Sequence, residues 1–314
     1  MSQSLPRPQL SMGLTTFAAA DPGGWERLFD HARLFDRAGV DRLVVSDHVA
    51  FGENLEAYGR PETGGVQGGK QPTGPDGLWL EPLTVLTAVG AVTSRVRLGT
   101  NILQAALRRP AVLAKTASTL DVLSGGRLDL GVGVGWQREE YEAAGLSFEG
   151  RGRLLDQTLE VLRTLWREQR ASYDGDGLRF ENIHQMPKPV QPGGVPIWVS
   201  GTVNRNVARR LARFGSGWIP WGPAAADPRA GIAAMREAVA AEGRTEWDIQ
   251  VVGTLRAARN DNGEPDVKAT LERVPDLVEA GVTDVRVTWP IPDDIDAAEE
   301  SVTALVQGFR AITR

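Results

Sequence analysis

Strand-like and helix-like segments alternate eight times along this chain of 314 residues, and the alternation constrains the fold more than any other feature. Each strand-like segment is short and apolar, and each is followed by apolar residues at helical spacing. The expected strands are residues 10–17, 40–46, 96–100, 128–134, 195–200, 217–219, 249–255 and 284–289. The expected helices are residues 25–37, 82–93, 110–123, 153–168, 203–214, 228–242, 266–280 and 293–312.

This alternation requires a parallel sheet, because right-handed crossovers place each helix on the outer side of the sheet. Eight units without a nucleotide-binding fingerprint favour a closed (β/α)8 TIM barrel, an α/β fold, over an open doubly wound sheet. No low-complexity linker divides the chain, so residues 1–314 are predicted to form one domain. Insertions are expected after strands two and four, and residues 171–183 are predicted to form a small hairpin before strand five.

The insertion after strand two covers residues 51–78 and has no regular hydrophobic period. It contains eight glycines and three prolines. A stretch of this length inside a compact domain is usually a functional excursion such as a lid over the site. A disordered surface insertion is the alternative.

Composition narrows the chemistry. The net charge of -5, without a basic block, argues against a nucleic-acid partner. The absence of cysteine excludes disulfides and thiolate nucleophiles. Neither a signal peptide nor an apolar run of about 20 residues is present, so no membrane association and a cytoplasmic location are expected. Three histidines and few lysines disfavour a metal-dependent hydrolase or a Schiff-base enzyme, and no metal site is predicted.

Residues 126–141 are predicted to form a short strand followed by a polar, aromatic turn or helix, and the end of the strand carries few side chains. Gly131, Gly133 and Gly135 alternate with apolar residues, and Trp136 follows them. One interpretation is that the bare backbone lets a flat ligand approach closely. The other is a tight strand-to-helix turn without a ligand. The pattern is not a dinucleotide fingerprint, because no Gly-x-Gly-x-x-Gly opens a helix after it.

The reacting groups of TIM barrels gather at the carboxyl ends of the strands. Outside the glycine-rich end of strand four, the candidate site residues at these ends are Asp47, His48, Thr100, Asn101, Ile102, Ser200, Gly201, Thr202, Trp218, Trp221, Gly222 and Trp289. Four tryptophans on one rim, with Trp136 as the fourth, suggest an aromatic pocket for a planar ligand, although core filling also explains some of them.

Two of these positions point to particular chemistry. His48 follows an acid at a strand end, which favours a role in proton transfer over a purely structural one. The sequence 200–202 precedes a helix, where hydroxyls and free N–H groups could hold a phosphate. An ordinary Ser/Thr N-cap is the alternative for that segment.

The chain resembles the bacterial luciferase-like monooxygenase superfamily, and within it the branch that uses the deazaflavin coenzyme F420. The resemblance rests on four motifs and spans nearly the whole sequence. They are Ser-Asp-His at 46–48, Leu-Gly-Thr-Asn-Ile at 98–102, the block at 126–136, and Trp-Val-Ser-Gly at 198–201, with the 173–180 hairpin in support.

The resemblance implies site residues and a reaction. His48 would be the catalytic proton donor or acceptor beside the coenzyme ring, and Asn101–Ile102 would form a non-proline cis peptide behind the ring. Ser200, Gly201 and Thr202, with Gly222 opposite, would hold the coenzyme phosphate. The remaining residues expected to bind the coenzyme are Asp47, Thr100, Gly131, Gly133, Gly135, Trp136 and Trp221.

One departure from the family concerns Trp136. The F420-dependent sugar-phosphate dehydrogenases carry a glutamate there, so an apolar or aromatic substrate is expected instead of a sugar phosphate. Glu139 or Glu140 could replace that acid from the next turn, but surface solvation is the favoured interpretation of both. The predicted reaction is hydride transfer between F420 and a small organic substrate. The alternatives are a monooxygenase that uses reduced flavin mononucleotide (FMN), and a coenzyme-binding protein without catalysis. Family members are often dimers, so a homodimer is expected.

Overall fold

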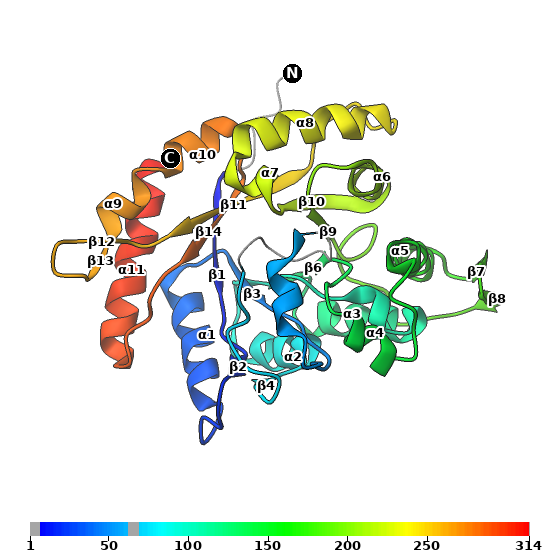
Figure 1. Ribbon diagram of the computed structural model, residues 1–314, viewed down its shortest axis with the longest axis horizontal. Helices are drawn as coiled ribbons and strands as arrows, with labels where there is room; N and C mark the ends of the chain where they lie inside the picture. Colours follow the sequence, from blue (N-terminus) through cyan, green and yellow to red (C-terminus); the bar gives the residue numbers. More distant parts are fainter. Residues whose placement is uncertain (1–6, 62–68, 314) are drawn as a thin grey trace.

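The predicted TIM barrel is confirmed by a computed structural model, which describes residues 7–61 and 69–313. Eight parallel strands close in the order β1-β14-β11-β10-β9-β6-β5-β3, with the helices arranged around them (Figure 1). The barrel strands are β1 (Gln9–Gly13), β3 (Arg42–Val45), β5 (Arg97–Thr100), β6 (Leu128–Val132), β9 (Ile197–Gly201), β10 (Gly215–Pro220), β11 (Gln250–Arg256) and β14 (Asp284–Thr288).

Amphipathic helices follow these strands and bury one face each against the barrel. In α1, for example, Leu28, Ala32 and Phe35 are buried at the expected three- and four-residue spacing. That helix ends at Gly39, whose φ of 92° is in the left-handed region where glycine is favoured. The main helices are α1 (Glu26–Ala38), α2 (Pro82–Val92), α3 (Pro110–Leu123), α5 (Arg151–Arg167), α6 (Arg205–Phe214), α8 (Pro228–Ala241), α9 (Val267–Leu271), α10 (Val274–Ala280) and α11 (Ile295–Ile312).

The predicted helix 266–280 is two helices, α9 and α10, in the structure. Pro275 lies in the first turn of α10. Its missing N–H could not bond to the carbonyl of Leu271, so the helix is interrupted before it and starts again with proline at a tolerated position.

Shorter elements lie between the barrel strands and the main helices. The predicted hairpin is present as β7 (Ala171–Gly175) and β8 (Leu178–Ile183) between α5 and β9, and it projects away from the body beyond α5 (Figure 1). In the structure the excursion after β3 extends to Trp79. It contains the short helix η1 (Leu55–Gly59) and strand β4 (Leu78–Trp79), which pairs with β2 (Phe17–Ala18). Residues 62–68 of the predicted lid lie outside the described residues. The other short elements are η3 (Ala105–Leu107), α4 (Arg138–Ala143), α7 (Pro223–Ala226), β12 (Ala258–Arg259) and β13 (Pro265–Asp266).

Buried ion pairs close the amino-terminal end of the barrel. Arg42 on β3 contacts both Asp284 on β14 and Asp129 on β6, and Arg97 on β5 also reaches Asp129 at 2.6 Å. Burial alone would raise the pKa of Asp129, but the two arginines hold it below its usual range. These charges are paired across four strands, so they tie the barrel together at its base.

Apolar side chains fill only part of the barrel above these ion pairs. Trp198, Ile219 and Val252 form a buried cluster against which Ile102 packs. A Cβ at Gly217 would overlap the Trp198 ring, so the glycine makes room for the indole. On the opposite side, Thr254 and Thr288 are exposed. The mouth of the barrel is therefore open on the β11–β14 side.

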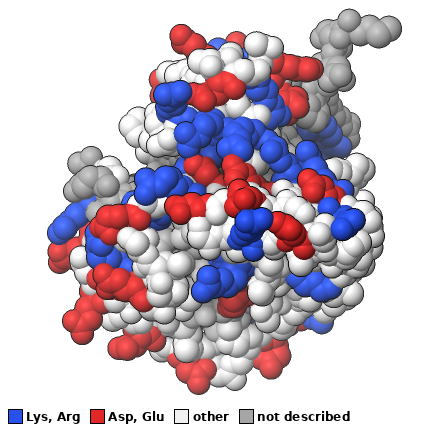
Figure 2. All heavy atoms as spheres, turned by 90° about the vertical axis from the view of Figure 1, so that its right-hand side faces the viewer, with Lys and Arg blue, Asp and Glu red and all other residues white. Residues whose placement is uncertain are grey.

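The outer surface mixes both signs of charge. Figure 2 shows arginine and lysine side chains gathered on one face with acidic side chains among them. On α5 and α6, Asp156 pairs with Arg209 at 2.8 Å and with Arg210 at 2.5 Å, and Glu160 pairs with Arg213 at 2.6 Å. These pairs join neighbouring outer helices. In the described part of the chain, every helix is too short or too polar to cross a bilayer.

Candidate active site

His48 is held by a buried carboxylate. Its Nδ1 lies 3.2 Å from Oε2 of Glu140 in α4, and the His48 side chain is only 9% exposed. Glu140 itself is fully buried. The favoured interpretation of Glu140 as a solvated surface residue is therefore wrong, and of the two acids it is Glu140 that lies beside His48. Because an ionised carboxylate only accepts hydrogen bonds, this pair places the hydrogen on Nδ1 and leaves Nε2 to exchange a proton.

The Glu140 carboxylate also receives donors from two other segments. Val49 N donates to Oε1 at 2.8 Å, and the Gln104 amide donates to both oxygens at 2.9 and 3.0 Å. Glu140 thus joins the ends of β3, β5 and β6. A buried carboxylate is unfavourable unless it accepts hydrogen bonds, and here several donors reach it. These hydrogen bonds hold the Glu140 side chain in one position.

Asp47 connects the same loops through a second carboxylate. Its carboxylate accepts two hydrogen bonds from Arg108, at 2.6 and 2.9 Å, and one from Gln104 N at 2.8 Å. Arg108 also pairs with Glu81 at 2.9 Å. Both carboxylate oxygens of Asp47 accept hydrogen bonds from other residues of the protein. Asp47 therefore orients the loop that carries His48.

Aromatic rings surround the imidazole. Phe51 lies 4.3 Å from His48 between ring centroids, Trp79 lies 4.8 Å away edge-on, and Trp136 lies 5.9 Å away. Tyr58 in η1 packs on Trp136 at 5.4 Å. The excursion after β3 therefore folds back over His48. The buried Nε1 of Trp136 has no hydrogen-bond partner within the described residues, which leaves one polar atom available to a ligand.

The predicted cis peptide between Asn101 and Ile102 is present. The three glycines of the neighbouring strand end accommodate this segment. A Cβ at Gly131 would overlap the carbonyl oxygen of Thr100, and one at Gly133 would lie 2.8 Å from Cδ1 of Ile102. At Gly135, whose φ is 72°, a Cβ would overlap the side chain of Gln104. The bare strand thus packs against residues 100–104, an explanation that neither sequence interpretation included.

The predicted phosphate segment lies on the next two strands. Gly201 on β9 pairs with Pro220 on β10, so residues 200–202 and 221–222 emerge side by side. The N-cap of α6 is Asn204, whose Oδ1 accepts from Val207 N at 3.0 Å. The Ser/Thr N-cap alternative is therefore wrong. Among the described residues, the hydroxyls of Ser200 and Thr202 have no protein hydrogen-bond partner, in keeping with a ligand-facing role. Gly222 has a φ of 60°, which a side chain would strain.

Only part of the predicted tryptophan rim is formed. Trp218 is fully buried on the side of β10 opposite the inward-facing Ile219, and its Nε1 donates to the Gly201 carbonyl at 2.9 Å. It supports the phosphate segment from behind and does not line the mouth. Trp289 is 6% exposed, and its Nε1 donates to Ser301 of α11 at 2.9 Å. The alternation of side chains along a strand explains this outcome, because neighbouring residues face opposite sides.

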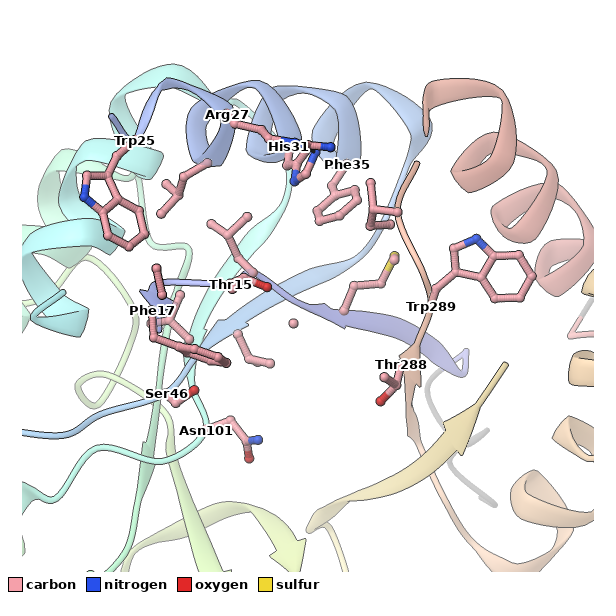
Figure 3. Close-up of a pocket in the computed structure, with 18 of the residues that line it drawn as sticks. Thr15, Phe17, Trp25, Arg27, His31, Phe35, Ser46, Asn101, Thr288 and Trp289 are labelled. Atoms are coloured by element: carbon pink, nitrogen blue, oxygen red, sulfur yellow. Dashed lines mark hydrogen bonds between the residues drawn. The ribbon is translucent and has the colours of Figure 1, made fainter. Parts of the chain in front are cut away.

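A pocket of about 630 Å³ opens beside this cluster. Figure 3 shows Arg27, His31 and Phe35 of α1 at one end and Ser46, Asn101 and Thr288 at the other. The pocket borders the His48 cluster without including it. Phe17 connects the two, because it lines the pocket and stacks on Trp79 at 4.4 Å.

Comparison with known proteins identifies the family. The sequence profile of the luciferase-like monooxygenase family matches residues 10–273. An uncharacterised protein of Mycobacterium tuberculosis (strain ATCC 25618 / H37Rv) is 32% identical over 270 residues, covering 85% of this chain and 88% of that protein. An F420-dependent glucose-6-phosphate dehydrogenase of Segniliparus rotundus is 34% identical over 209 residues, covering 64% of this chain and 55% of that protein.

A solved structure agrees in fold. That of an F420-dependent secondary alcohol dehydrogenase in complex with an F420-acetone adduct aligns with a TM-score of 0.74 at 16% identity, covering 97% of this chain and 99% of that chain. At this identity the likeness supports the architecture alone. The profile match extends over most of the sequence and includes the His48, Asn101 and Gly131 segments. The chain therefore belongs to the luciferase-like monooxygenase family of oxidoreductases.

Proposed function

We propose that this luciferase-like oxidoreductase uses coenzyme F420 and transfers a hydride between it and a small organic substrate. The observation that carries the proposal is the His48–Glu140 pair at the carboxyl ends of the strands, next to the cis peptide of Asn101. A histidine fixed by a buried carboxylate is suited to proton transfer. Relatives that use F420 support the choice of coenzyme.

The residues present fit a flat coenzyme with a phosphate. Asn101 and Ile102 would support the ring from behind, and Trp136 offers an unpartnered Nε1 beside it. Ser200 and Thr202 offer hydroxyls at the start of the segment that leads into α6. When bound, F420 supplies a carbon that accepts or donates a hydride.

The protein's own residues would perform the remaining tasks. His48 would take up or return the substrate proton at Nε2, while Glu140 keeps the imidazole in the orientation set by Nδ1. Phe51, Trp79 and Trp136 would exclude water from the reacting atoms and favour an apolar or aromatic substrate. Because the first two belong to the excursion after β3, that segment is proposed to act as a lid.

Equilibrium titration of the purified protein with F420 and, separately, with FMN, followed by absorbance, tests the coenzyme. We expect micromolar binding of F420 and much weaker binding of FMN. Replacing the two phosphate-facing hydroxyls, by Ser200→Ala with Thr202→Val, is expected to weaken F420 binding by about tenfold, because hydrogen bonds to a charged group are lost. Thr245→Val, at an exposed position far along the chain, is the matched control.

Each alternative predicts a different result in this experiment. Binding of FMN in preference to F420 would favour the monooxygenase. Tight F420 binding without turnover across a panel of alcohols, ketones and aldehydes would favour a carrier protein. Binding of neither coenzyme would remove redox chemistry from the proposal.

We further propose that two copies of the chain associate through the outer face of α3. Val112 and Leu123 on this helix are 64% and 66% exposed, and Met186 and Val190 in the segment after β8 are 51% and 56% exposed. That segment lies along α3, because Val190 N donates to Asp121 at 2.8 Å. Such an apolar stripe is typical of an interface.

Light scattering coupled to size-exclusion chromatography tests the dimer. Leu123→Glu is expected to convert a dimer into a monomer, since a charge would be buried between the two copies. Ile312→Glu, at an exposed apolar position on α11, should leave the dimer intact. A wild-type protein that elutes as a monomer at micromolar concentration would rule out this interface.

A further inference from the structure

A buried arginine inside the barrel lacks an acidic partner. Arg286 on β14 is 8% exposed, and its Nε donates a long hydrogen bond of 3.4 Å to Oγ of Ser11. That is its only hydrogen bond within the described residues, and none of their carboxylates lies within ion-pair distance of it. Asp284, two residues earlier on the same face, is already engaged by Arg42 and by Ser11, the latter at 2.5 Å.

The environment of Arg286 opposes a positive charge. Burial and the neighbouring Arg42 lower the pKa of Arg286 to about 9. A guanidinium remains charged at neutral pH even so. A buried cation without a counter-charge is unfavourable, and arginines elsewhere in the barrel are paired with aspartate. An anionic ligand would supply the counter-charge that Arg286 lacks.

Arg286 also lines the pocket of about 630 Å³ beside the His48 cluster. Thr288, the next inward-facing residue on β14, lies with Asn101 at the barrel end of that pocket (Figure 3). Most other lining side chains are apolar or aromatic, including Phe17, Trp25 and Phe35. The charged residues Arg27 and Asp293 also line the pocket, but both are exposed and they pair with each other. The pocket therefore combines one buried positive charge, unpaired among the described residues, with mostly apolar walls.

We propose that Arg286 binds the carboxylate of the substrate, and that the substrate is an aromatic or apolar carboxylic acid whose body lies in this pocket. This assignment rests on the proposed oxidoreductase function and narrows its substrate class. Arginine presents two parallel N–H groups that match a carboxylate, and a buried charge at one end of a mostly apolar pocket orients an amphipathic ligand. Asn101 lies at the same end, so the bound acid would reach the proposed coenzyme site.

Isothermal titration with phenylacetate and its neutral isostere phenylacetamide tests the assignment, with F420 present and absent. The wild-type protein is expected to bind phenylacetate at least tenfold more tightly than phenylacetamide. Arg286→Met should abolish this preference without changing the affinity for F420. Arg229→Met, which removes an exposed arginine on α8, should keep it.

The stability of the free protein separates a ligand-binding role from a structural one. If Arg286 is an unpaired charge awaiting a ligand, Arg286→Met should unfold at an equal or higher temperature, because an unfavourable buried charge is removed. A lower midpoint, or failure to fold, would make Arg286 structural and overturn the proposal. So would equal binding of the two probes to the wild-type chain, or a loss of F420 affinity in the variant. If F420 fails to bind at all, the titration without coenzyme still tests Arg286 by itself.

Discussion

Replacing His48 by alanine is expected to lower kcat by about a hundredfold or more, while the affinity for F420 stays within a factor of a few. The imidazole is the group placed to exchange a proton, whereas the expected coenzyme contacts come mainly from other strand ends. Turnover would be followed as the change in coenzyme absorbance with the best substrate found in a panel. Unchanged turnover would remove His48 from the mechanism.

A companion variant, Glu140→Gln, separates orientation from simple stability. The amide occupies the same volume, but it cannot accept all of the hydrogen bonds that converge on the carboxylate, so the imidazole is held less firmly. We expect kcat to fall by about tenfold with little change in KM, because the imidazole would be oriented less well in the same pocket. Glu139→Gln, the neighbouring and partly exposed carboxylate, is the matched control. An unchanged kcat would mean that Glu140 acts only in packing.

Replacing Gly131 by alanine is expected to destabilise the folded protein by about 3 kcal/mol or more. The added Cβ would overlap the backbone oxygen of Thr100, which cannot turn aside as a side chain can. The measurement is the free energy of unfolding in urea, since a two-state transition reports the difference directly. Strand β6 and the neighbouring segment would have to separate to relieve the overlap.

Two further glycine variants should lower the stability by smaller amounts, because their added Cβ atoms meet less resistance. The Cβ of Gly133→Ala would meet only the Ile102 side chain, with Cδ1 at 2.8 Å and Cγ1 at 3.0 Å, and the substitution should cost about 1 kcal/mol because a side chain can move. Gly13→Ala has no neighbour within 4 Å and should change stability little. An equal loss in the free energy of unfolding at all three positions would contradict the explanation that glycine is needed for close contact with residues 100–102.

The regular alternation of apolar segments was sufficient to predict the barrel, because eight strand–helix units leave few parallel arrangements. His48 could be placed because strand ends of a TIM barrel meet at one rim. The cis peptide between Asn101 and Ile102 followed only from the family resemblance. The motifs at these positions also supported the family. Whether Ser200 and Thr202 bind phosphate remains a prediction, supported by the N-cap that Asn204 occupies.

The positions of Glu140 and Arg286 depend on contacts between distant segments, which the sequence alone does not show. Glu140 is one of two adjacent acids in a charged stretch, for which surface solvation is the favoured expectation, and its burial involves Gln104, 36 residues earlier. Arg286 is flanked by valines that face the helices, and nothing local distinguishes it from a surface arginine. One signal was nevertheless available, the alternation of side chains along a strand. On β14 it places Arg286 on the same side as Asp284, and on β10 it places Trp218 on the side opposite Gly217 and Ile219.

Hydrogen bonds connect the segments around Asp47 and Glu140, whereas ring contacts connect the excursion to His48. Charged hydrogen bonds fasten the exits of β3, β5 and β6 to one another. The described residues of the excursion touch the imidazole through Phe51 and Trp79, by ring contacts alone. Substitutions in the excursion can therefore reshape what enters the barrel without disturbing the hydrogen bonds that hold His48 and Asp47. We expect differences among relatives in the size and shape of the molecules they admit to be concentrated in this stretch of chain, while the groups proposed for proton transfer keep their positions.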